Sequence, residues 1–329
     1  MPTRRDTQVT FLYERWRAIS TGIIETAATS FLLLIAVRYY HAGAVSKAAV
    51  AAGGSLGLLL SPLVVSFAAH SGWRVTRVAA WVLGAGAINL LIATVWPIEP
   101  VYVVAGVLAM AGSSAAIPLM TQVYQENYPT AERGKLFSKT VVIRIAAAAL
   151  FGQFAGNLLT ADIGNFRVLL LLFAMAFAFA SFCVSRCPSR PLTQEGGAHP
   201  FRALRFVRED HLFRRTLICW MLLGFANLFM FPLRVEYLAN PAYKLGLTVQ
   251  TVALVTVVIP NVARLIMSPV WGWLFDRMNF FSLRMTLNVG FALGILTFFT
   301  SNTMAGLITG AVIFGISNAG GDVAWSLWV

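Results

Sequence analysis

The chain has 329 residues, of which 58% are hydrophobic and only 12% are charged. A water-soluble domain carries about 25% charged residues, so this composition excludes a soluble globule and places the chain in a lipid bilayer. The formal net charge of +12 does not indicate nucleic acid, because lysine and arginine lie at the ends of apolar runs and in loops, without a basic stripe interleaved with aromatic residues.

The sequence contains a series of continuous apolar runs, each close to the roughly 20 residues that a membrane-spanning helix needs. In chain order they cover residues 18–38, 45–69, 76–96, 100–123, 139–160, 166–185, 214–236, 249–273, 284–301 and 304–328. They are rich in Ala, Leu and Gly and lack the alternation of barrel strands. We therefore predict an all-α membrane protein, a bundle of membrane-spanning helices.

The longest polar connection runs from Arg186 to Arg215 and contains several prolines and a Gly-Gly pair. It separates six predicted spans from four. We expect an N-terminal six-helix half at 1–185, a central linker at 186–213 and an incomplete C-terminal half of four helices at 214–329.

Basic residues are distributed unevenly between the two sides of the predicted membrane. Most of the 25 lie in the N-terminal segment, after the second, fourth and eighth spans, and in the linker. The opposite side carries Arg38, Lys47, Arg167, Arg234 and Lys244. Because cytoplasmic loops are enriched in Lys and Arg, we predict a multi-pass protein of the inner (plasma) membrane with the N-terminus and linker in the cytoplasm.

The two halves contain a faint repeat. One constant shift superposes Ser61-Pro62 on Ser268-Pro269 and Arg77 on Arg284, and a similar shift aligns Gly112 with Gly315. By this alignment the chain stops where the first half continues with two more spans. We expect a fragment of a twelve-span protein that lacks roughly 60 residues, as internal repeats of transporters suggest; the alternative is a natural ten-span protein.

A turn after the eighth span reads Gly-x-Leu-x-Asp-Arg, with Gly272, Leu274, Asp276 and Arg277. Two six-span halves, a basic linker and this turn resemble the major facilitator superfamily of secondary transporters. Phe280-Phe281 replace the basic pair of that family's loop. The resemblance implies that Asp276 is a state-dependent latch, whereas a short acceptor at a helix end is also an ordinary cap.

Four charged residues interrupt the apolar runs: Glu25 in the first span, Arg144 in the fifth, Arg264 in the eighth and Asp322 in the tenth. A charge inside hydrocarbon costs at least about 2.5 kcal/mol, so each needs a partner, water or a function. The resemblance implies that the first and tenth spans line a central cavity and that the fifth and eighth face each other. Three roles stay open: a structural ion-pair set or gate, proton coupling through Glu25 or Asp322, and binding of an anionic substrate by the arginines.

Uncharged polar residues in the predicted cavity spans form a second set of candidates. They either contact substrate or join helices by hydrogen bonds. The set is Thr21, Thr26, Ser113, Ser114, Gln122, Asn227 and Asn318.

The sequence shows no metal-ligand cluster, no nucleophile cluster within the spans and no phosphate-binding loop ending in Gly-Lys-Ser/Thr. We therefore predict no enzyme activity, no metal and no cofactor. The favoured function is a secondary active transporter of a small solute, driven by protons, with the lipid bilayer and a small-molecule substrate as partners. Alternatives are a transport-inactive sensor or assembly protein and a membrane-embedded enzyme; the sequence does not identify the substrate or distinguish symport from antiport.

Overall fold

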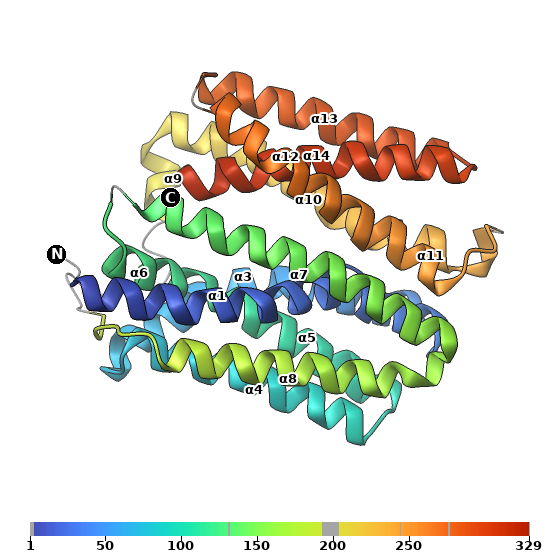
Figure 1. Ribbon diagram of the computed structural model, residues 1–329, viewed down its shortest axis with the longest axis horizontal. Coiled ribbons are helices and arrows are strands. Elements are labelled where there is room, and N and C mark those ends of the chain that lie inside the picture. The colour runs from blue at the N-terminus through green and yellow to red at the C-terminus, as the bar shows by residue number, and fades with distance from the viewer. Residues whose placement is uncertain (1–2, 131, 193–203, 244, 276, 329) are drawn as a thin grey trace. The chain divides into compact units, whose positions relative to one another are not determined.

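A computed structural model describes residues 3–130, 132–192, 204–243, 245–275 and 277–328 (Figure 1). These residues form helices and contain no named β-strand, only an isolated bridge between Arg74 and Pro191. The predicted all-α fold class is confirmed.

The first six predicted spans correspond to helices. They are α1 (Arg4–Thr26), η1 (Ala27–Phe31) and α2 (Leu32–Arg38); α3 (Ala44–Ser71); α4 (Val75–Val95); α5 (Glu99–Ala115) and α6 (Ile117–Asn127); α7 (Arg133–Ala161); and η2 (Ile163–Asn165) with α8 (Phe166–Ser185). Within the fourth run the α-helix is interrupted at Ala116, which the sequence did not predict. Pro118 stands at the start of α6 and cannot donate the backbone hydrogen bond that a continuous helix requires.

The remaining helices follow the linker. They are α9 (Leu204–Glu209), α10 (His211–Ala239), η3 (Pro241–Tyr243), α11 (Val249–Ala253), η4 (Leu254–Val258), α12 (Ile259–Phe275), α13 (Phe280–Thr300) and α14 (Met304–Trp328). In the described part of the chain, nine helical segments are long and apolar enough to cross a membrane. The seventh predicted span is not among these nine, but α10 covers its whole length.

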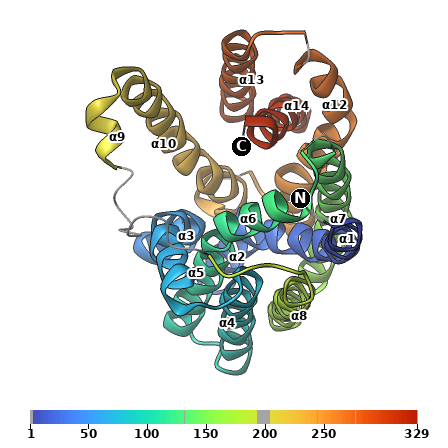
Figure 2. The same cartoon turned by 90° about the vertical axis from the view of Figure 1, so that its left-hand side faces the viewer.

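The chain divides into two compact units, each assembled from separate segments. The first contains residues 1–17, 42–130 and 170–233. In it α5 packs against both α3 and α4 (Figure 2). The approach of α3 to α5 is close, since a Cβ at Gly57 would lie 2.1 Å from the carbonyl oxygen of Ala111. A small residue at a helix crossing is the ordinary means of bringing membrane helices together.

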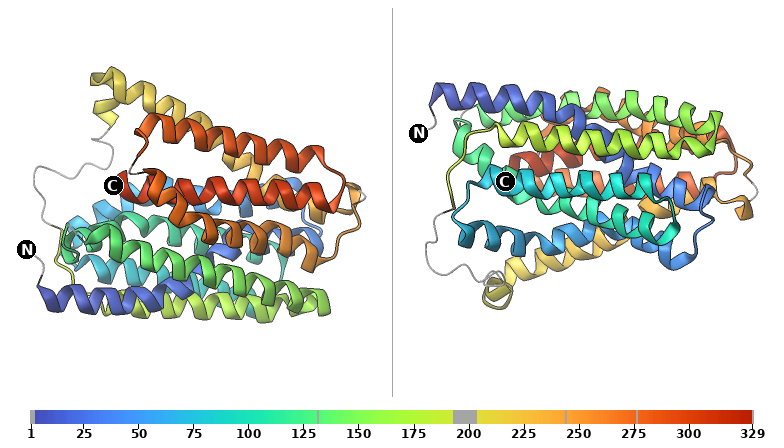
Figure 3. Two further views of the ribbon diagram at one scale, coloured as in Figure 1. Left: turned by 45° about the horizontal axis from the view of Figure 1, so that its top comes forward. Right: turned by 90° about the horizontal axis from the view of Figure 1, so that it is seen from below.

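The second unit contains residues 18–41, 131–169 and 234–329. Here α14 packs against α12 and α13, which Figure 3 shows in orange to red, and α7 packs against α11 and α12. Contact between α7 and the α11–α12 segment agrees with the expectation that the fifth and eighth spans face each other. The four charged residues described next, Glu25, Arg144, Arg264 and Asp322, all belong to this unit.

Two π-helical segments interrupt α-helices within the second unit. η1 lies in the first span and η4 in the eighth, and the two are in contact. The Ser30 hydroxyl of η1 donates to the Thr256 hydroxyl of η4 at 3.1 Å, and both side chains are buried. π-helical segments are frequent at functional sites. Here η1 follows shortly after Glu25 in the sequence, and η4 shortly precedes Arg264.

Candidate functional site

The four charged residues expected within the spans lie together in the second unit. Glu25 comes from α1, Arg144 from α7, Arg264 from α12 and Asp322 from α14. They are far apart in sequence, and packing of the four helices brings them into one cluster.

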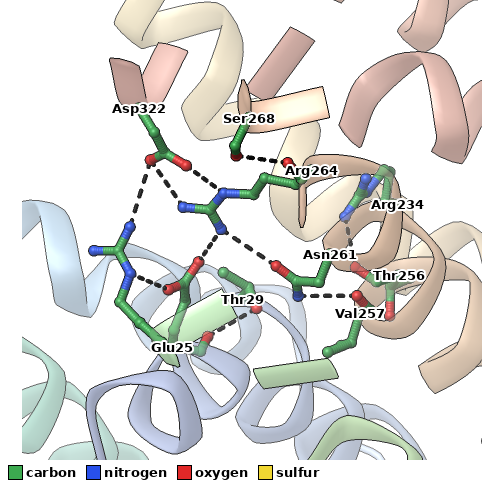
Figure 4. Close-up of polar contacts among 10 residues, drawn as sticks. Glu25, Thr29, Arg234, Thr256, Val257, Asn261, Arg264, Ser268 and Asp322 are labelled. Carbon is green, nitrogen blue, oxygen red and sulfur yellow. Dashed lines mark hydrogen bonds and ion pairs between the residues drawn. The ribbon is translucent and has the colours of Figure 1, made fainter. Parts of the chain in front are cut away.

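Arg264 is the centre of this cluster (Figure 4). Its Nη2 donates to Oδ1 of Asp322 at 2.8 Å, and its Nε donates to Oδ2 of the same carboxylate. Its Nη1 donates to Oε1 of Glu25 at 2.5 Å. The guanidinium therefore binds Asp322 by a two-pronged fork and Glu25 by a single bond, and such forks are the strongest ion-pair geometry.

Arg144 completes the arrangement from the other side. Its Nε lies 3.3 Å from Oε2 of Glu25, and its Nη2 lies 3.5 Å from Oδ1 of Asp322. Each carboxylate thus touches both arginines, and the charges alternate around a closed set. We call Glu25, Arg264, Asp322 and Arg144 the ion-pair ring.

The ring is unevenly buried. The Arg264 side chain is 5% exposed, whereas those of Glu25, Asp322 and Arg144 are 20 to 26% exposed. Its formal charges sum to zero, so the ring as a whole has no net charge to desolvate. Removal of a single member would leave an uncompensated charge in a poorly hydrated place, which is far costlier than the intact set.

Asn261 supports Arg264 and was not predicted from the sequence. Its Oδ1 accepts from Nη1 of Arg264 at 3.3 Å, and its Nδ2 donates to the Val257 carbonyl oxygen at 2.9 Å. Val257 lies in η4, so the π-segment takes part in orienting the arginine. The sequence offered one indication of this role: Asn261 is a polar residue one helical turn before the charge of Arg264.

Arg234 is a further embedded charge, which the sequence placed on the side opposite the cytoplasm, near the end of the seventh predicted span. The structure instead buries it within α10, with 3% exposure. Its Nη2 donates to the Thr256 carbonyl oxygen at 3.1 Å, and its guanidinium carbon lies 4.6 Å from the centre of the Phe314 ring. The predicted span already contains Arg234, and α10 continues beyond its predicted end to Ala239, so the residue lies further from the end of the helix than expected.

The uncharged polar candidates are divided between the units. Thr21, Thr26 and Asn318 belong to the second unit, and Asn318 lies one turn before Asp322 on α14. The Thr26 hydroxyl donates to the backbone oxygen of Ile23, a local bond that fixes its direction. The side chain of Asn227 lies outside the described residues.

Ser113, Ser114 and Gln122 belong to the first unit instead. The Gln122 amide donates to Glu126 one turn later at 3.1 Å. These three residues are therefore not part of the ion-pair ring.

The Gly-x-Leu-x-Asp-Arg turn lies at the end of α12. Gly272 and Leu274 are in the helix, and Arg277 is exposed, with its guanidinium carbon 3.8 Å from the centre of the Trp273 ring. Asp276 lies outside the described residues. The role of this turn as a latch stays a prediction.

A family model described as Major Facilitator Superfamily matches residues 18–329. The chain belongs to the Major Facilitator Superfamily. The predicted family is thereby confirmed, and this superfamily member is a multi-pass membrane protein of a transporter family.

Solved structures resemble this superfamily member along nearly its whole length. The nucleoside transporter NupG matches with a TM-score of 0.71 at 14% identity, covering 97% of this chain and 82% of that one. A bacterial homologue of the human lysosomal transporter Spinster matches at 0.65 and 14%, covering 98% and 75%. The xylose transporter XylE from E. coli matches at 0.63 and 15%, covering 98% and 81%. At these identities the likeness establishes the fold; among curated protein sequences none matches.

Within the described residues, no three or more His, Cys, Asp or Glu side chains gather in a group that could hold a metal. The ring itself pairs each carboxylate with arginines, which occupy the positions that a cation would take.

Proposed function

We propose that this chain is a secondary active transporter that moves a small polar solute by alternating access in symport with protons, and that the ion-pair ring is its gate. The carrying observation is that four helices each contribute one charge to a closed, neutral set. Such a set holds the helices together in one state, and its members must separate when the helices move apart.

Glu25 is the member best suited to couple protons to this movement. Arg264 and Asp322 hold each other by a two-pronged contact between α12 and α14, which also pack against each other. Glu25 makes only one hydrogen bond to Arg264 and a 3.3 Å contact with Arg144. A proton on Glu25 would remove the negative charge from both contacts, and α1 would then be released while the Arg264–Asp322 pair persists.

We further propose that the halves 1–185 and 214–329 move against each other about the central linker and that Asp276 latches one state. The placement of the N-terminus and linker in the cytoplasm, and of the protein in the inner membrane, rests on the asymmetry of Lys and Arg. The sequence pattern and the family support these proposals.

The solved structures suggest which solutes to test first. NupG is described as a nucleoside transporter and XylE as a xylose transporter, and one matching structure is described as a D-xylose–proton symporter. We propose a neutral polyhydroxylated solute for this chain, because a ring that is already neutral offers no free charge to an ionic substrate.

The experiment is uptake into vesicles by the protein expressed from its complete reading frame. Radiolabelled nucleosides and pentoses are tested with and without an imposed proton gradient, and exchange is measured separately. For Glu25→Gln we expect loss of gradient-driven accumulation with exchange retained, whereas Glu132→Gln, at an exposed position, should behave as wild type. Unchanged accumulation by Glu25→Gln rules out its coupling role, and absence of uptake or exchange for every solute argues against transport of this class.

A further inference from the structure

The first unit contains a hollow that is separate from the ion-pair ring in sequence and chemistry. Its volume is about 530 Å³. It is lined by the turn after α3, the first turns of α4, the end of α8 and the first residues of the linker. The lining includes Gly72, Trp73, Arg74, Arg77, Trp81 and Ser185.

The hollow is held in shape by backbone and hydroxyl contacts. Gly72 ends α3 with a φ of +65°, a conformation that favours glycine, and this turn leads into α4. The Val75 amide donates to the Arg190 carbonyl oxygen at 3.3 Å. The Thr76 amide donates to the Ser189 hydroxyl at 3.1 Å. The start of the linker is therefore fixed against the start of α4.

The lining carries two positive charges and no carboxylate. Arg74 and Arg77 are both exposed, and among the described residues neither has a carboxylate within ion-pair distance. The Arg77 guanidinium carbon lies 4.4 Å from the centre of the Trp73 ring. Stacking uses the face of the guanidinium and leaves its N–H edge for oxygen ligands, and Arg suits phosphate in particular.

The hollow lies at a membrane surface. α4 begins at Val75 and α8 ends at Ser185, and both helices are long and apolar enough to span the bilayer. Trp81 also lines the hollow, and it is 62% exposed one to two turns into α4. An exposed tryptophan at this depth is typical of the boundary between headgroups and acyl chains.

We propose that this hollow binds the headgroup of an anionic phospholipid. Arg74 and Arg77 contact the phosphate, and the acyl chains leave past Trp81 into the bilayer. Basic pockets between membrane helices at the headgroup level suit such lipids. A soluble phosphate compound shares the chemistry of the headgroup, but it would make no use of the apolar exit at Trp81.

The test measures retention of phosphatidylglycerol by the purified protein in mixed micelles, using native mass spectrometry, with phosphatidylcholine as the neutral comparison. The variant Arg74→Gln/Arg77→Gln is compared with Arg4→Gln/Arg5→Gln, which removes the same charge from two exposed positions at the start of α1. At about tenfold per 1.4 kcal/mol and about 1 kcal/mol per basic residue, we expect a loss of roughly 30-fold in affinity for the first variant and little loss for the control.

A second variant tests the contribution of the space in the hollow independently of its positive charge. Ser185→Phe fills the space and keeps both arginines, and we expect it also to reduce phosphatidylglycerol retention. A separate experiment measures binding of glycerol phosphate, which has the phosphate but no acyl chains. Equal retention by the Arg74/Arg77 variant and its control overturns the proposal. So does arginine-dependent binding of glycerol phosphate without arginine-dependent binding of the lipid.

Discussion

Arg264 donates a 2.5 Å hydrogen bond to Glu25, although 239 residues separate them along the chain. This bond joins α12 to the first span, and Arg264 holds Asp322 of α14 at the same time. A single guanidinium thus links three helices. The energetic consequences of that position can be tested by substitution.

Arg264→Gln should lower the free energy of unfolding by about 3–5 kcal/mol, because two partly buried carboxylates would lose their shared partner. Arg264→Lys should be intermediate, since lysine keeps the charge but not the planar fork. Thermal or denaturant unfolding in detergent measures the free energy of unfolding of both variants.

Arg205→Gln is the matched control. Arg205 pairs with Glu209 at 2.5 Å, but the two side chains are 68% and 51% exposed. An exposed ion pair contributes only about 0–1 kcal/mol. Equal losses for the Gln variants at 264 and 205 would contradict the central role of Arg264.

Removing one charge of each sign from the ring should be less harmful than removing either alone. In Glu25→Gln/Arg144→Gln the two-pronged Arg264–Asp322 pair remains and the cluster stays neutral. Each single variant instead leaves a net charge of one sign. We expect a coupling energy of about 0.5–3 kcal/mol between the two positions, measured by a double-mutant cycle on unfolding. Additive losses would show that Glu25 and Arg144 do not act within one set.

The sequence allowed the ring residues to be selected but not their pairing. A charge within a long apolar run is conspicuous, because hydrocarbon makes it costly, so Glu25, Arg144, Arg264 and Asp322 were all identified as candidates. Which atoms meet depends on the rotation and packing of four helices, and this information does not appear in the run itself. The family resemblance supplied only the expectations that the first and tenth spans line a central cavity and that the fifth and eighth spans face each other.

Other features escaped prediction for local reasons. Asn261 is uncharged, and many such amides in spans only join helices. Arg234 stood near the expected end of a span, where a basic residue is ordinary. The π-segments η1 and η4 use residues that would equally form an α-helix, so their position is decided by packing. Element boundaries were thus the weaker part of the prediction and span identity the stronger part.

The contact between α12 and α14 gives a test of packing close to the ring. A Cβ at Gly315 would lie 2.4 Å from the Pro260 carbonyl oxygen and 2.9 Å from the Ala263 Cβ. Gly315→Ala should therefore separate the helices and lower the free energy of unfolding by about 1–3 kcal/mol. Gly321, on the same helix, has only Phe291 nearby at 3.8 Å. Gly321→Ala should be neutral or stabilising, because Ala favours a helix over Gly by about 1 kcal/mol. If the Gly315→Ala variant were as stable as the Gly321→Ala variant, α14 would not approach α12 closely at Gly315.

The thiol of Cys187, just beyond α8, should be unreactive at neutral pH. Burial away from water, with the Glu14 carboxylate nearby, raises the pKa of Cys187 to about 12. At about pH 8 its thiolate should be roughly a thousand-fold scarcer than that of a cysteine with an ordinary pKa near 8.5. Because a raised pKa favours the neutral thiol, the alkylation rate should keep rising about tenfold per pH unit above pH 9. The alkylation rate of an ordinary thiol levels off in that range.

Iodoacetamide labelling of the Cys183→Ala/Cys219→Ala variant, followed by mass spectrometry, measures the rate. The same variant denatured in detergent is the control. Rapid labelling of the folded protein at pH 8 would contradict the buried position of Cys187.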